Sequence, residues 1–194
     1  MHQDRKKMME QEKTKLVQSE IDDRTSFAKK AYLVGKIYAS LIGSLACLGM
    51  LTTLDTPLKS TNDRLQALAG ILWLGWSFLK TSSIKSNMEN RLMLHSLIAN
   101  EKTNLDPEQT SAVIKNAQIV GIAGGVGNLA VVAAVVAHGL GHMSSGMACL
   151  SGTAICLASE FFAKNTHKNN NLFLKAQMPK GVSLPDLTKR REKE

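Results

Sequence analysis

The sequence predicts an all-α integral membrane protein with four transmembrane helices in two antiparallel hairpins, the second and third helices extending into the cytosol. Three features lead to this prediction: four long apolar stretches, charges confined between them, and an uneven distribution of Lys and Arg. The predicted spans are residues 31–54, 65–84, 117–137 and 144–163. Each has about the 20 residues that a helix needs to cross the hydrocarbon core of a bilayer.

The apolar residues are segregated along the chain rather than around each helix. Residues 117–137 carry no charge and no polar face, which a helix half exposed to water would need. A soluble four-helix bundle would place polar residues on the outer face of every helix. The mean hydropathy of −0.08 therefore hides a strongly apolar part and a strongly charged part.

The basic residues predict the orientation. Residues 1–30, 80–116 and 164–194 hold 21 Lys and Arg, whereas the two other links, 55–64 and 138–143, hold two. Four spans put the three basic segments on one side, and the positive-inside rule makes that side the cytosol. Both termini are then cytoplasmic. No aromatic-studded basic module is present, so the net charge of +8 does not indicate a nucleic-acid partner.

The first region is a charged cytosolic segment, residues 1–30, which we expect to be helical in part and solvated. The first span follows, and its Lys36 lies close enough to the entry to reach back to water. Within it, Ala39 and Gly43 lie four residues apart, a spacing that lets another helix approach closely. Asp55 and Pro57 are expected to end this helix, because proline cannot continue the hydrogen-bond ladder.

The second span has a short apolar part. Its clean apolar part, residues 67–79, is only about 20 Å of helix, so a full crossing has to include Lys80. Ser60 and Asp63 have the spacing of a capping box before it. A cytosolic helical hairpin, residues 85–116, is expected next.

The third helix is predicted to begin at Pro107, because Asp106 is a good N-cap and proline suits the first helical position. In the third span, Gly121 and Gly125 have the small-xxx-small spacing of a tight helix crossing. Neither a preceding strand nor a following Lys-Ser/Thr supports a phosphate-binding loop. Asn128 is the polar group at mid-span, and it predicts either an interhelical hydrogen bond or a polar point on a solute path.

The fourth span begins after a glycine-containing turn, with Ser144 or Ser145 as the expected cap. Ala148 and Gly152 form its small-residue stripe. Glu160 predicts an ordinary pair with Lys164, four residues on, with a proton site as the alternative.

The remaining candidates for chemistry are few. His138 and His142 have the spacing of metal ligands, but the two glycines near them disfavour one helix face, so they are only weak candidates. Residues 164–194 are expected to form a basic, loosely ordered tail. No catalytic set and no cofactor motif is present in the sequence, so we do not expect an enzyme.

The sequence predicts a non-catalytic multi-pass protein that acts as a scaffold or as a subunit of a membrane complex. Its partners would be the lipid bilayer and other membrane subunits or further copies of itself, contacted through small-residue helix packing and the basic cytosolic segments. The alternative is a small channel or transporter that uses the intramembrane polar residues Asn128, Glu160 and Lys36. A membrane-embedded enzyme ranks third, because it rests only on Glu160 and the two histidines.

Overall fold

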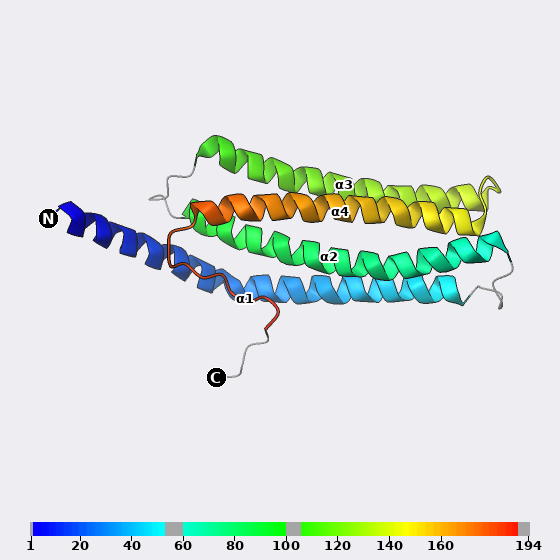
Figure 1. The fold of residues 1–194 in the computed structure, drawn as a ribbon, viewed down its shortest axis with the longest axis horizontal. Helices are drawn as coiled ribbons and strands as arrows, with labels where there is room; N and C mark the ends of the chain where they lie inside the picture. Colours follow the sequence, from blue (N-terminus) through cyan, green and yellow to red (C-terminus); the bar gives the residue numbers. More distant parts are fainter. Residues whose placement is uncertain (1, 53–59, 100–105, 190–194) are drawn as a thin grey trace.

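A computed structural model describes residues 2–52, 60–99 and 106–189 and places most of them in four long helices. These are α1 (His2–Leu51), α2 (Thr61–Ala99), α3 (Pro107–Gly139) and α4 (Ser145–Gln177) (Figure 1). No strand occurs in the described ranges. The predicted all-α class is therefore confirmed.

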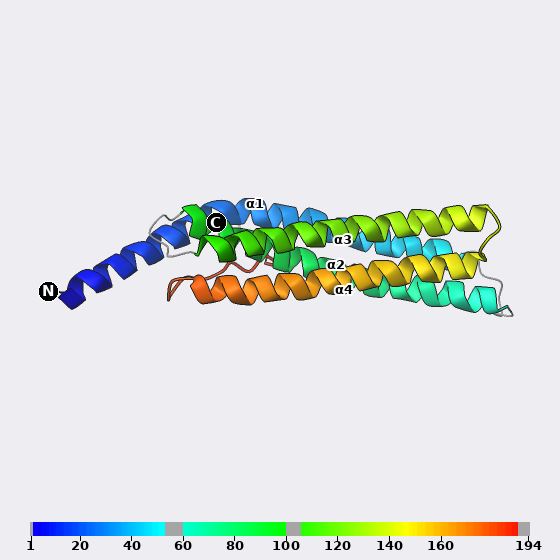
Figure 2. The same cartoon turned by 90° about the horizontal axis from the view of Figure 1, so that it is seen from above.

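The four helices lie side by side in an order that differs from their order along the chain. α2 packs against both α1 and α4, while α3 packs against α4. Across the molecule the order is therefore α1, α2, α4, α3 (Figure 1). Seen from above, the first turns of α1 extend beyond the other helices (Figure 2). α3 stands at one side with a single extensive neighbour.

The end of α1, the start of α2 and the turn between α3 and α4 all lie at the same end of the molecule (Figure 1). There the first turns of α2 and α4 meet, because the Gly146 N–H donates to the Asn62 side-chain oxygen at 2.6 Å. A Cβ on Gly146 would lie 2.4 Å from the Asn62 carbonyl oxygen, so only glycine permits this approach. The two hairpins are thereby joined directly at this end.

The predicted helix starts are confirmed by their capping bonds. The Asp106 carboxylate accepts from the Glu108 N–H, and the Ser144 hydroxyl accepts from the Met147 N–H. Before α2, Ser60 and Asp63 bond each other's backbone N–H reciprocally, at 3.0 and 3.2 Å. The predicted end of the first span near Asp55 and Pro57 lies outside the described residues, as do residues 100–105 of the predicted hairpin.

Three helices in the described ranges are long and apolar enough to cross a membrane: α1 from Arg5 onward, α3 and α4. They are consistent with an integral membrane protein. α2 is not among them, so the second predicted span, residues 65–84, remains a prediction. Each helix is longer than one crossing requires, since the 33 residues of α3 rise about 50 Å and the hydrocarbon core is about 30 Å thick.

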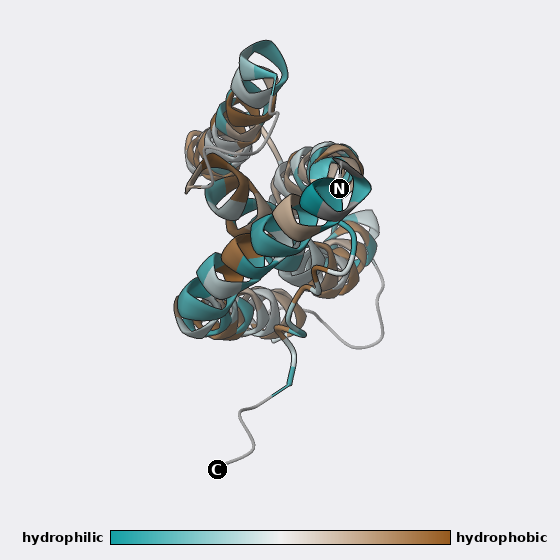
Figure 3. Cartoon of the chain, turned by 90° about the vertical axis from the view of Figure 1, so that its left-hand side faces the viewer, coloured by the Kyte–Doolittle hydropathy of each residue, from teal (hydrophilic) through white to brown (hydrophobic). Residues whose placement is uncertain are grey.

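The helices divide lengthwise into two parts. We call the end that contains the predicted spans the apolar half, and the end with the N-terminus and the end of α4 the polar half. Figure 3 looks onto the polar half, where the first turns of α1 are hydrophilic. Large apolar side chains that are more than half exposed line the apolar half: Val34, Ile37, Leu41, Leu45, Leu48, Ile71, Phe78, Ile122, Val126, Leu129, Val132, Val135, Val136 and Phe161. A surface this apolar suits lipid and not water.

The C-terminal region differs from the loosely ordered tail expected from residue 164. α4 continues to Gln177, and the segment 178–189 then lies along the polar half. Leu187 is 4% exposed and packs with Tyr32 and Leu92, while the Ser183 N–H donates to Gln18. The prediction of a loose tail rested on the basic composition of this segment. It did not take account of the apolar residues spaced along it, which make these contacts.

Candidate functional site

A cleft of about 500 Å³ lies between α2, α3 and α4, and charged and amide side chains line it. It runs along the helices across the boundary between the apolar and polar halves. α4 lies between the two walls, which α2 and α3 provide. The lining residues are Trp76, Lys80, Ser83, Ile84, Asn87, Arg91, Ala117, Val120, Gly121, Gly124, Gly125, Asn128, Cys156, Ser159, Glu160, Ala163 and His167.

An ion pair joins α2 and α4 in the middle of this cleft. The Lys80 Nζ lies 2.5 Å from the Glu160 Oε1, and Glu160 is only 3% exposed. The partner predicted for Glu160 was Lys164, four residues along the same helix. The structure pairs it with Lys80 instead, because Glu160 points inward between the helices. A buried charge is costly unless it is paired, and the cross-helix lysine provides that pairing.

The second carboxylate oxygen of this pair is left without a protein partner. Glu160 Oε2 is buried and accepts no hydrogen bond from any described residue. An unsatisfied buried acceptor costs about 1–3 kcal/mol, and more when it is charged. This oxygen is therefore the strongest indication that the cleft holds a further group.

The structure brings two of the three predicted intramembrane polar residues together. Asn128 lines the cleft that contains Glu160, and its side chain makes no hydrogen bond with the described residues. Lys36 instead lines a separate groove between α1 and α2, along with Tyr32 and Lys85. These three residues therefore do not form one path.

Inside the apolar half the cleft ends at an aromatic cluster. Trp73 and Trp76 pack edge to face with ring centroids 5.0 Å apart. Cys156 is buried against them, and Val131 from α3 packs on the same cluster. The cleft lining stops at Trp76 and Cys156, so the neighbouring turns are filled by side chains.

The opposite mouth of the cleft is polar. Arg91 lies there and forms no ion pair with any described residue, and His167 is buried beside it at 4% exposed. The backbone carbonyl of His167 accepts a hydrogen bond from the Asn90 amide at 2.9 Å. α2 and α4 are thus held together at the mouth by this bond and deeper in the cleft by the ion pair.

The glycines of α3 have two different surroundings. A Cβ on Gly121 or Gly125 would meet nothing within 4 Å, so these two glycines make no close helix contact with the part of the chain that the structure describes. They form part of the cleft wall instead. Gly127 is the α3 glycine that packs on α4, where a Cβ would lie 2.9 Å from the Ser159 hydroxyl. Gly124 also faces open space.

The other predicted packing residues lie between helices. A Cβ on Gly43 would come within 2.7 Å of Ser77, and the Ser77 hydroxyl donates to the carbonyl of Ala39, so α1 and α2 cross closely there. A Cβ on Gly152 would lie 3.5 Å from Val131 of α3. Ala148 is buried on the same face of α4, at 7% exposed.

The two histidines proposed as weak metal candidates lie in and beside the turn between α3 and α4. A ring nitrogen of His138 is 3.0 Å from the Met143 carbonyl oxygen, and both histidines are exposed. Within residues 2–52, 60–99 and 106–189, no three His, Cys, Asp or Glu side chains are grouped to hold a metal ion. At the first turn of α2, which lies at the same end of the molecule as these histidines, Asp63 is the only acidic residue that the structure describes. Its carboxylate accepts from the Ser60 N–H and so caps α2.

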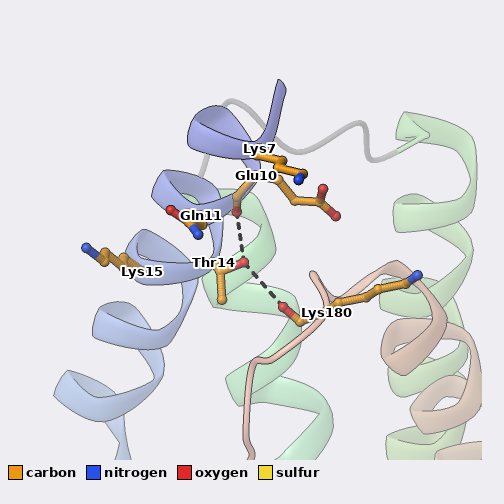
Figure 4. A pocket seen from close by; sticks show the side chains of 6 residues that line it. All are labelled: Lys7, Glu10, Gln11, Thr14, Lys15 and Lys180. Atoms are coloured by element: carbon orange, nitrogen blue, oxygen red, sulfur yellow. Dashed lines mark hydrogen bonds between the residues drawn. The ribbon is translucent and has the colours of Figure 1, made fainter. Parts of the chain in front are cut away.

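A second hollow lies in the polar half, between the first turns of α1 and the segment after α4 (Figure 4). The Thr14 hydroxyl lies between the carbonyls of Glu10 and Lys180, at 2.8 and 3.4 Å. Lys15 points away from the side on which Lys7 and Lys180 lie (Figure 4). The lysines therefore do not converge on a ligand, and the contact mainly ties the C-terminal segment to α1.

Sequence reasoning missed Lys80 as the central cation of the cleft. The available signal was its position, since a lysine that follows 13 apolar residues in the predicted span has to find water or a carboxylate. Glu160 was the only acidic residue within any other predicted span. Pairing the two charges would have predicted the contact between α2 and α4.

Comparison with known proteins gives no match: no protein-family model, no curated protein and no solved structure matches the chain.

Proposed function

We propose that the chain is a non-catalytic four-span membrane protein that acts as a scaffold or subunit of a membrane complex, with α3 as its association surface. The observation that carries the proposal is the position of α3 at the side of the molecule. It is the most apolar of the helices and packs extensively only on α4, leaving large side chains such as Ile122 and Leu129 more than half exposed.

The four-span arrangement is supported by the geometry of the ends. α2 begins beside the first turn of α4, where Asn62 bonds Gly146, and these two helices stay in contact along their length. A helix in lateral contact with a spanning helix over that length shares its membrane depth. Together with the 21 Lys and Arg in the three basic segments, this favours a cytoplasmic polar half.

Topology can be tested by labelling single cysteines in a background in which Cys47, Cys149 and Cys156 are replaced by serine or alanine. Lys59→Cys and Ser144→Cys are expected to react with an impermeant reagent from the non-cytoplasmic side. Asn104→Cys is expected to react only after permeabilisation. If Lys59→Cys and Ser144→Cys label from opposite sides, α2 does not span.

Association through α3 can be tested with a photo-crosslinking amino acid in native membranes. We expect protein adducts of defined mass from position 129 or 122 on α3. The control is Phe78 of α2, which is 78% exposed and should give lipid adducts alone. Two differently tagged copies show whether the partner is the chain itself. Lipid adducts from all three positions would contradict the association surface.

A channel or transporter is the alternative function, and the cleft that holds Glu160 and Asn128 is the observation in its favour. Two observations weigh against it: Lys36 lies in another groove, and the cleft ends at the cluster of Trp73 and Trp76. Reconstituted vesicles would distinguish the two functions. A proton or ion flux that Asn128→Leu abolishes would favour transport, and a flux indifferent to that change would not.

A further inference from the structure

We propose that the cleft between α2, α3 and α4 binds a phosphate ester that carries a hydroxyl group, such as a glycerol- or inositol-phosphate headgroup. Arg91, at the polar mouth, would contact the phosphate, Lys80 would attract the anion from deeper in the cleft, and the free oxygen of Glu160 would accept the hydroxyl. This site is separate from the exposed surface of α3 that the proposed association uses, and the proposal does not depend on that association.

The size of the cleft suits a headgroup. Its volume of about 500 Å³ lies within the range of about 300–1,000 Å³ that is usual for small-molecule sites. A helix has a diameter of about 10 Å with its side chains and would not enter a hollow of this volume over several turns. Gly121, Gly124 and Gly125 present no side chains to the cleft, which keeps the α3 wall open beside the two charges.

The carboxylate selects a neutral donor. Glu160 Oε1 already accepts from Lys80, and the buried Oε2 has no partner among the described residues. An ammonium group at Oε2 would lie close to the Lys80 ammonium, and two like charges repel strongly where water is excluded. A hydroxyl group satisfies the same oxygen without that repulsion. The ligand should therefore present a hydroxyl and not an amine.

The charges of the lining select an anion as the second group. Lys80 and Arg91 are both cationic, whereas Glu160 is the one acidic side chain among the lining residues that the structure describes. Lys80 uses one of its three N–H donors on Glu160, and the Arg91 guanidinium has no ion-pair partner among those residues. A guanidinium fork matches the geometry of a phosphate well.

The position of the cleft allows the phosphate ester to come from the membrane or from solution. It crosses the boundary between the apolar and polar halves, at the depth where the headgroups of the adjoining leaflet would lie. A phospholipid can enter from the side of the bilayer, and a soluble polyol phosphate can enter from the polar mouth beside Arg91 and His167. The experiment must distinguish these two sources.

The test uses the full chain purified in detergent, with lipid binding followed by native mass spectrometry. We expect one phosphatidylglycerol to bind at least tenfold more tightly than phosphatidylcholine. Phosphatidylethanol has the same charge without the hydroxyl, and it should bind several-fold more weakly than phosphatidylglycerol. Glycerol 3-phosphate, added in solution, should displace the lipid if the headgroup alone is recognised. Failure to displace it means that the acyl chains contribute and that the source is the membrane.

Variants connect the binding to the cleft. Arg91→Gln should reduce the preference for phosphatidylglycerol at least fivefold, and this exposed residue can be changed without disturbing the fold. Lys36→Gln is the matched control, because Lys36 is a cation in the groove on the other side of α2. Equal binding of phosphatidylglycerol and phosphatidylcholine, or an equal loss in the two variants, overturns the site. Equal binding of phosphatidylethanol overturns the role of the Glu160 oxygen.

Discussion

α3 and α4 form one hairpin and have the same length, 33 residues each, yet they bury very different parts of themselves. α3 buries two residues, Val113 and Gly127. α4 buries eleven, among them Thr153, Glu160 and His167. The more apolar helix is therefore the more exposed one, the reverse of what a soluble protein would show.

The difference shows that polar and small side chains, and not the large apolar ones, are buried between the helices of this molecule. Lipid solvates the valines and leucines of α3 as well as another helix would, so burying them against protein brings little gain. A carboxylate or an amide on α4 has no such alternative and points inward. Four pairs of substitutions test this comparison, and each pair sets an inward residue against an outward one.

The largest expected effect comes from Glu160→Leu. It leaves the Lys80 ammonium half-buried without its carboxylate, which costs about 3–5 kcal/mol when a buried pair is broken on one side. The neighbouring Phe161 is 59% exposed, and Phe161→Leu should be nearly neutral. Thermal unfolding in detergent measures both, and adding Lys80→Met to Glu160→Leu should recover part of the loss. Equal stability of the two single variants would contradict an inward Glu160.

Leu174→Ala and Leu129→Ala make the same chemical change on the two helices. Leu174 is fully buried with Met93, Leu97 and Val113, so the change should cost about 2–5 kcal/mol. Leu129 on α3 is 69% exposed, and its truncation should leave the free energy of unfolding almost unchanged. A large loss for Leu129→Ala would mean that another protein surface covers α3, which the crosslinking at position 129 would then identify.

Gly127→Leu and Gly125→Leu distinguish two glycines that are two residues apart on α3. The first would force a side chain into Ser159 and Cys156 of α4, and such overpacking costs about 1–3 kcal/mol. The second faces open space, and replacing a helical glycine there should stabilise the helix by up to about 1 kcal/mol. The same Gly125→Leu variant should weaken phosphatidylglycerol binding, because its side chain enters the cleft. Identical melting temperatures for the two variants would show that α3 and α4 are packed differently.

The smallest expected effect is in the polar half. Asn170 donates to the Val113 carbonyl at 3.4 Å and accepts from the Asn116 amide at 3.2 Å. Asn170→Ala should therefore cost about 1 kcal/mol. Asn169 is exposed beside it, and Asn169→Ala should have no measurable effect. Hydrogen exchange at the start of α3 provides a second readout, since only Asn170→Ala should speed it.

The sequence was sufficient to predict where α2, α3 and α4 begin, whereas α1 was expected to be helical only in part before residue 31 and instead runs unbroken from His2. Capping residues such as Asp106 and Ser144 act on their own backbone within three residues, so the prediction needs no knowledge of the rest of the fold. The length of α4 was underestimated, because its last turns bury the polar residues His167, Asn170 and Asn171 along with a single apolar one, Leu174. A polar interior does not follow the periodicity by which helices are usually recognised.

The arrangement of the helices could not be predicted in the same way. A span that is apolar on every side, such as residues 117–137, does not indicate which face meets a neighbour, so Gly121 and Gly125 were favoured over Gly127. The order α1, α2, α4, α3 depends on contacts between residues far apart along the chain. Lys80 and Glu160 are 80 residues apart, and the only sequence signal for their contact is that each is a charged residue in a predicted span and requires a partner of opposite charge.

The packing of residues 183–187 against α1 has a consequence for how the protein is made. Leu187 completes a cluster with Ala28 and Tyr32, and Ser183 bonds Gln18, which are residues that a ribosome adds more than 150 positions earlier. Because synthesis proceeds at about 5–20 residues per second, these partners are added many seconds after α1 has been synthesised. During that interval the corresponding face of α1 is open to chaperones and to early-binding proteins, and the arrival of Leu187 ends that access.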